Sequence, residues 1–157
     1  MKRKIKFRGK DVRTSVWIYG VFHEHIDITP AAIYEDSESR ENHIKNHTHY
    51  LIIQDAFSDY CMPRNIQCFE VTSETVGQFT GKVDKNKVEI YEEDIVRVYE
   101  RDRTFDIVVK WNTDAMAFMA YHADGNQAPL SWFANLSKCE LEVIGNIHDN
   151  PEFIKQQ

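Results

Sequence analysis

The sequence contains few of the residues that hold small extracellular folds together. Its 157 residues include only three cysteines, Cys61, Cys68 and Cys139, and no two of them form a CxxC pair. Neither a disulfide framework nor a thiolate zinc site is therefore indicated. We expect a reducing compartment, most simply the cytoplasm.

Long apolar runs are missing as well. Residues 1–9 are basic like the start of a signal peptide, but no apolar segment follows them. No run approaches the roughly 20 apolar residues that a membrane-spanning helix needs. We therefore expect a soluble protein that is neither exported nor held in a membrane.

Glycine and proline are also scarce, with 6 and 4 copies. The chain is 42% hydrophobic and 28% charged, close to the average of folded domains and far from that of disordered chains. A chain of this length can bury one real core without covalent links. We expect residues 1–157 to form a single domain.

A positive net charge is missing too, because the chain carries −6 at neutral pH. Phosphate backbones attract surfaces rich in Lys and Arg, so this balance opposes non-specific binding to nucleic acid or anionic lipid. The start of the chain is an exception. It gathers six cations: Lys2, Arg3, Lys4, Lys6, Arg8 and Lys10.

Alternating residues predict strands at the start of the chain. Ile5 and Phe7 alternate with the cations at positions 4, 6 and 8, which is typical of a half-buried strand. Residues 16–22 are β-branched and aromatic and predict a second strand, paired with the first as a hairpin.

Residues 35–49 are strongly polar. Their only strongly apolar side chain is Ile44, too little to fasten the segment to a core. We predict a flexible loop here, followed by short strands at residues 50–54 and 66–71.

The second half of the chain shows the most regular pattern. Short strands are predicted at residues 88–91, 95–99, 105–111, 116–121 and 141–147. Repeated short strands predict a mainly β fold, as a small barrel or a tightly curled sheet. A short helix at 129–136 would plug one end and a helical turn would follow at 151–156, with Trp111, Trp132 and Phe133 as core or plug residues.

Three separated groups of residues share one family pattern. E-T-V-G-Q-F-T-G at 74–81 precedes D-K-N at 84–86 and E-I-Y-E-E-D-I-V at 89–96. I-K-F-R-G-K at 5–10, with Trp17 and Gly20, opens the pattern, and E-V-I-G-N-I-H-D-N-P at 142–151 closes it. Together they resemble the YopX-like family of phage and prophage proteins over nearly the whole chain, with residues 34–66 covered least.

The resemblance implies a mainly β fold of SH3-like or YopX-like type and an origin in a mobile element, but no activity and no catalytic residue. It implies structural roles for eight motif residues: Gly77, Gln78, Phe79, Gly81, Tyr91, Asp94, Gly145 and Asn146. The family pattern prefers glycine where this chain has Lys87 and Glu93. We therefore expect a wider loop at Lys87 and an ordinary type I turn at Glu93.

The densest carboxylate cluster is Glu92, Glu93 and Asp94. Paired carboxylates can act as acid and base or hold a divalent cation. At a turn before a strand they more often accept backbone N–H bonds, and we favour that structural interpretation.

Two histidine pairs share a spacing of two residues. His23 and His25 should project to one face of a strand, and His47 and His49 repeat the spacing near His43. Such pairs can bind zinc or nickel, although no cysteine or carboxylate completes a recognisable ligand spacing. These four histidines are a candidate metal site. We favour the simpler interpretation that they are solvent-exposed side chains without a metal.

The basic residues Lys4, Lys6 and Arg8 are candidates for contact with nucleic-acid phosphates, and Phe7, Trp17 and Tyr19 could stack on bases. Alternation gives a plainer explanation, because it places Phe7 on the opposite, core-facing side. Lysines on an edge strand also prevent aggregation between sheets.

The leading hypothesis is a non-catalytic phage or prophage accessory protein that binds a macromolecule, most simply a host or phage protein. The alternatives are a nucleic-acid-binding small β-barrel and a metal-dependent hydrolase using Glu92, Asp94 or the histidines. We expect no cofactor, and homo-oligomers remain open.

Overall fold

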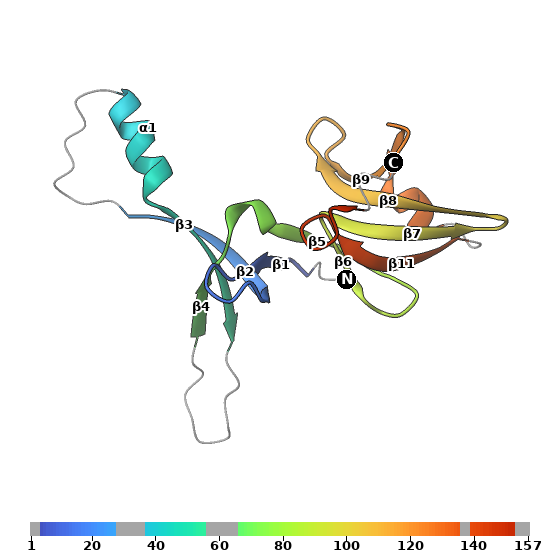
Figure 1. Cartoon of the computed structure of the whole chain (residues 1–157), viewed down its shortest axis with the longest axis horizontal. Helices are drawn as coiled ribbons and strands as arrows, with labels where there is room; N and C mark the ends of the chain where they lie inside the picture. The colour runs from blue at the N-terminus through green and yellow to red at the C-terminus, as the bar shows by residue number, and fades with distance from the viewer. Residues whose placement is uncertain (1–3, 28–36, 56–65, 136–138, 153–157) are drawn as a thin grey trace, which may run out of the picture. The chain divides into compact units, whose positions relative to one another are not determined.

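The computed structural model describes residues 4–27, 37–55, 66–135 and 139–152. The chain, which we expected to form a single domain, divides into two compact units, which we describe separately. The N-terminal unit spans Lys6–Val76, and the C-terminal unit comprises Met1–Ile5 with Gly77–Gln157. Both are built mainly from antiparallel strands, which confirms the mainly β fold class (Figure 1). The sheets do not close into a barrel, so the barrel prediction is not confirmed.

Four strands of the N-terminal unit pair in the order β4-β3-β2-β1. They are β1 (Phe7–Lys10), β2 (Trp17–Ile26), β3 (Thr48–Asp55) and β4 (Ile66–Glu70). The predicted hairpin is β1–β2, with Phe7 opposite Gly20. Its connection is fixed by Asp11, whose Oδ1 accepts hydrogen bonds from the N–H groups of Arg13 at 3.0 Å and Thr14 at 2.7 Å.

This sheet curls around its inner face. Beyond β1, Asp11 forms an isolated bridge with Val71, just after β4. A short 3-10 turn, η1 (Ser73–Thr75), follows, and the Thr75 Oγ1 accepts the N–H of Lys10 at 2.8 Å. Inside the curl Ile52 is fully buried, and a Cβ at Gly20 would collide with the carbonyl oxygen of Ile53. Only glycine lets these two strands approach so closely.

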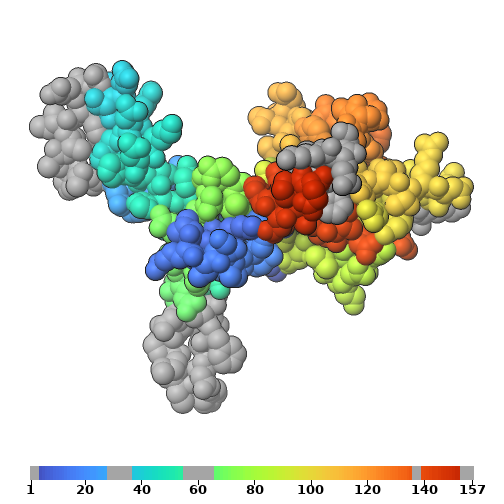
Figure 2. All heavy atoms as spheres, in the orientation of Figure 1, coloured from blue at the N-terminus to red at the C-terminus, as the bar shows by residue number. Residues whose placement is uncertain are grey.

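The predicted flexible loop at 35–49 is wrong for its central part, because residues Ser37–Asn46 form helix α1. Residues 35 and 36 lie outside the described residues. Polarity does not prevent a helix here, since Glu, Arg and Lys have high helix propensity. Glu38 lies in the first turn and Lys45 in the last, where each suits the helix dipole. No α1 side chain is fully buried, and Figures 1 and 2 show α1 projecting from the strands of its unit.

The C-terminal unit contains a five-stranded antiparallel sheet in the order β10-β9-β8-β7-β11. Its strands are β7 (Asp94–Glu100), β8 (Arg103–Asn112), β9 (Ala117–His122), β10 (Gln127–Pro129) and β11 (Cys139–Asn146). Two further strands, β5 (Gly77–Val83) and β6 (Glu89–Tyr91), pair with each other. All five strands predicted in this half are present, with boundaries close to those expected.

Apolar side chains from β6 to β9 and β11 form one core with helix α2 (Leu130–Asn135). The predicted helix at 129–136 is thus confirmed through Asn135, and Leu136 lies outside the described residues, as does most of the predicted turn at 151–156. Leu130 and Phe133 lie three residues apart on one face of α2, and both are buried.

The prediction of two buried tryptophans is wrong. Trp132 is 65% exposed because it lies on the side of α2 away from Leu130 and Phe133. Trp111 is 43% exposed near the end of β8, where it packs edge-on against Phe118 at 5.2 Å between ring centroids. Among the described residues, no helix is both long and apolar enough to cross a bilayer.

Candidate functional site

The outer face of the β1–β4 sheet carries three of the four predicted histidines, His23, His25 and His49, and an apolar strip. Val21 lies opposite Ile53, which lies opposite Cys68, and Leu51 and Ile66 share this face. We call these five residues the apolar strip. Val21 is 61% exposed and Ile66 70% exposed, whereas Leu51 and Ile53 between them are half-buried. Apolar side chains therefore reach solvent across three neighbouring strands.

The predicted basic residues lie beside aromatic rings. Lys6 Nζ lies 5.4 Å from the centre of the Tyr19 ring, and the Arg8 guanidinium lies 4.6 Å from that of Trp17. Arg8 is only 6% exposed, so it packs instead of projecting into solvent. Lys4 belongs to the C-terminal unit and contacts Glu89 at 3.4 Å. Phe7 faces the inner side, as alternation predicted, and its ring packs at a tilt against that of Phe22, with 5.5 Å between the ring centroids.

The four histidines named for a metal site are not gathered around one point. His23 and His25 share the outer face as predicted, and His25 lies opposite His49. His47 instead stacks on His43 at 4.0 Å and bonds through Nδ1 to the His43 carbonyl at 2.9 Å. In the described part of the chain, no group of three His, Cys, Asp or Glu side chains is arranged to hold a metal ion.

The three clustered carboxylates of the C-terminal unit have separate structural partners. Glu92 Oε1 accepts the N–H of Trp111 at 3.0 Å, and Asp94 Oδ2 accepts the N–H of Tyr91 at 2.7 Å. Glu93 Oε2 lies 2.5 Å from His148 Nε2. This geometry agrees with the structural interpretation of the cluster.

Motif residues from positions 77–94 and 145–150 lie close together around the turn at Glu92 and Glu93, which connects β6 to β7. Gln78 accepts the N–H of Glu92 at 2.9 Å, and a Cβ at Gly77 would lie 2.8 Å from the Glu92 carbonyl oxygen. Asn146 Oδ1 accepts the N–H groups of His148 and Asp149, at 3.0 and 2.9 Å. Segments more than 50 residues apart in the sequence thus build one hydrogen-bonded corner.

Comparison with known proteins places the chain in a family. The model of the family described as YopX protein matches residues 6–155, nearly the whole sequence. The chain belongs to the YopX family.

The solved structures that match include the crystal structure of protein EF1440 from Enterococcus faecalis. The sequences are 24% identical, the match covers 98% of this chain and 99% of that chain, and the TM-score is 0.42. No curated protein matches the sequence significantly.

The loop at Lys87 is wider than a two-residue hairpin, as expected, because Val83 pairs with Glu89 across it. The ordinary type I turn expected at Glu93 is wrong. Lys87 and Glu93 both adopt left-handed conformations, with φ of 67° and 66°. Their surroundings hold them there. The Lys87 N–H donates to the Asp84 carbonyl at 3.0 Å, whereas the N–H of Glu93 donates to Val109 at 2.7 Å and its carbonyl accepts from Ile147 at 3.1 Å. Non-glycine residues pay a steric cost in this region.

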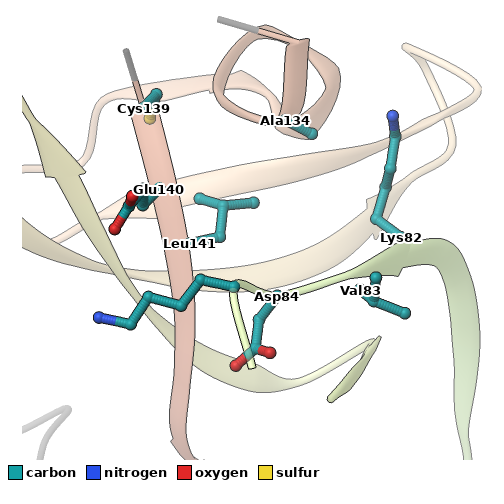
Figure 3. Close-up of a pocket in the computed structure, with 8 residues that line it drawn as sticks. Lys82, Val83, Asp84, Ala134, Cys139, Glu140 and Leu141 are labelled. Atoms are coloured by element: carbon teal, nitrogen blue, oxygen red, sulfur yellow. The ribbon is translucent and has the colours of Figure 1, made fainter. Parts of the chain in front are cut away.

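A pocket of about 220 Å³ lies between β11 and the end of β5 in the C-terminal unit (Figure 3). Figure 3 shows Leu141 pointing into the space between β11 and the Lys82–Asp84 segment. Asp84 links the two sides of the pocket. Its Oδ1 accepts a hydrogen bond from the N–H of Val88 at 2.8 Å, and its Oδ2 accepts one from the N–H of Val143 on β11 at 3.0 Å. Burial, together with the charge of Glu100, raises the pKa of the Cys139 thiol, which disfavours a nucleophilic thiolate.

Sequence reasoning missed Asp27 and Glu70, which contact His49 on the outer face. Asp27 Oδ2 lies 3.3 Å from His49 Nε2, and Glu70 Oε1 lies 2.7 Å from His49 Nδ1. A signal for Asp27 was present, because it follows His23 and His25 at the same spacing of two residues. Glu70 becomes visible only from the pairing of β3 with β4.

Proposed function

We propose that this YopX-family chain is a non-catalytic accessory module of a phage or prophage that binds another protein in the cytoplasm. The apolar strip on the outer face of the N-terminal unit is the contact surface. The observation that carries the proposal is the exposure of Val21 and Ile66, at 61% and 70%, on one continuous sheet face.

The strip resembles protein interfaces in composition. Contiguous exposed apolar side chains with few charges at the centre mark interaction surfaces, and aromatic and Arg or Lys side chains commonly surround them. Here Tyr19, 41% exposed, continues the strip along β2 toward Lys6. A partner with an apolar centre and a few acidic side chains fits this arrangement.

A protein partner is better supported than a nucleic acid. Binding to phosphates needs cations that reach solvent, and Arg8 is buried against Trp17. The net charge of −6 also opposes attraction to a polyanion.

A binding role is also better supported than hydrolysis. Glu92 and Asp94, the carboxylates considered for a metal-dependent hydrolase, accept backbone N–H bonds that fix the turn before β7. These two carboxylates thus stabilise the fold through hydrogen bonds to the backbone.

The test compares the wild type with the double variant Val21→Asp, Ile66→Asp in affinity capture from lysate of a host cell that carries the gene. The control is Val83→Asp, which changes an exposed valine of the C-terminal unit, 51% exposed. We expect one protein to bind the wild type and the control directly, with affinity reduced roughly thirtyfold in the double variant.

Capture that does not depend on the strip would contradict the proposal. So would retention of nucleic acid that is lost as salt is raised, because this would identify a polyanion as the partner.

A further inference from the structure

Four of the seven histidines in the chain contact Asp27, where β2 ends and α1 meets the sheet: His25, His43, His47 and His49. The main chain of Asp27 holds the helix end: its N–H donates to the His47 carbonyl at 2.9 Å, and its carbonyl lies 3.2 Å from His43 Nε2. The Thr48 hydroxyl caps the same end by donating to the Ile44 carbonyl at 2.5 Å. Asp27 is therefore one of the residues through which the end of α1 contacts the sheet.

The side chain of Asp27 faces two imidazoles. Its Oδ1 lies 3.2 Å from His25 Nε2, and its Oδ2 lies 3.3 Å from His49 Nε2. The other ring nitrogen of His49, Nδ1, lies 2.7 Å from Glu70 Oε1 on β4. His49 thus joins the ends of β2, β3 and β4.

The protonation state of His49 decides how many of its two contacts can be hydrogen bonds. An ionised carboxylate only accepts hydrogen bonds, and a neutral imidazole has a single N–H. Both contacts of His49 can be hydrogen bonds only when the ring is the doubly protonated cation. In the neutral ring, the shorter contact to Glu70 retains the proton, and the lone pair of Nε2 then faces the Asp27 carboxylate.

The charged groups around His49 favour the cation. The pKa of His49 is raised chiefly by the hydrogen bond that its ring donates to Glu70. Desolvation opposes this as the next largest effect, and the charge of Asp27 raises the pKa further. The remaining titratable neighbours are His25 opposite on β2, His23 stacked on His25, and His43 of α1. Because the pKa of His49 in the folded protein lies above its usual value of 6.5, the stabilisation is complete below that pH and is lost as pH rises through the folded pKa.

We propose that His49 forms a proton-dependent contact that holds the end of α1 against the sheet through Asp27. Protonated His49 binds Asp27 and Glu70 together and keeps the Asp27 main chain in place for His43 and His47. Loss of the proton turns the contact with Asp27 into a repulsion, and the end of α1 becomes loose. This device adds regulation by pH and does not depend on the apolar strip having a partner.

The test is a pH titration of the full chain followed by NMR, with the ring proton of His49 and the backbone amides of α1 observed together. We expect the amides near His43 and His47 to shift with the same midpoint as His49. Amide shifts with a different midpoint, or none, would overturn the proposal.

Two matched variants remove one negative charge each. Glu70→Gln removes the principal partner of His49, and we expect both midpoints to move to lower pH together. Glu24→Gln removes an exposed carboxylate of β2 that has no contact with His49. In this variant the pH midpoints of His49 and of the α1 amides should both be unchanged. A shift of the His49 midpoint in Glu70→Gln with unchanged α1 amides would overturn the coupling.

Asp27→Asn separates the two halves of the proposal. His49 should still titrate against Glu70, whereas the α1 amides should no longer follow it. If these amides still titrate with His49 in a folded Asp27→Asn protein, the link through Asp27 is wrong.

Discussion

The two units use their strands in different ways. In the C-terminal unit, Val96, Val98 and Ile107 have no exposed surface and belong to a core closed by α2. In the N-terminal unit, Ile52 is fully buried on the inner face, but the outer face leaves Val21 and Ile66 mostly exposed. The C-terminal unit thus closes a core over its sheet, whereas the N-terminal unit leaves one sheet face and the side chains of one helix exposed to solvent.

The largest expected difference between the units comes from truncating one β-branched side chain in each of them. Ile107→Ala should destabilise the C-terminal unit by about 2–5 kcal/mol, because it opens a cavity in a closed core. Val21→Ala on the outer face should change stability by less than about 0.5 kcal/mol. Urea unfolding followed by amide signals of each unit measures both. Equal effects would mean that the outer face is covered in solution.

A smaller effect is expected from the buried aspartate of the C-terminal unit. Asp84→Ala leaves three backbone N–H groups without their acceptor, those of Asn86, Val88 and Val143, and should cost about 2–3 kcal/mol. Asp124→Ala removes a similar bond to Asn126 in an exposed turn and should cost less. Thermal unfolding of both variants checks the order, and a reversed order would show that Asp84 does not hold the loop to β11.

The smallest effects concern the two left-handed residues. Lys87→Gly relieves steric cost at an exposed site and should stabilise the protein by about 0.5 kcal/mol, after the added freedom of the unfolded chain is subtracted. Glu93→Gly relieves the same cost but loses the contact with His148, so it should be neutral or destabilising. Denaturant midpoints of the pair measure the difference, and a more stable Glu93→Gly would show that the contact adds nothing.

The sequence predicted the C-terminal unit better than the N-terminal unit, for a physical reason. Strands such as β7 and β8 pair with their neighbours in sequence, so alternation and turn residues are sufficient to find them. Helix α1 has no apolar stripe, and a search for core-facing residues therefore returned a loop. Its helical propensity was visible in its Glu, Arg and Lys residues.

The candidate sites were predicted less well than the strands. Alternation correctly placed His23 and His25 on one face, but it could not show that β4 brings Glu70 to His49. It also placed Arg8 in solvent, whereas the curl of the sheet buries it over Trp17. Long-range pairing decides these contacts, and no local pattern contains that information.

The most direct test of the contrast between the units is native-state hydrogen exchange of the full chain. We predict the slowest exchange for the amides of β7 and β8, faster exchange for β2 to β4, and the fastest among these elements for α1. Protection of α1 and β2–β4 equal to that of β7 and β8 would contradict the account.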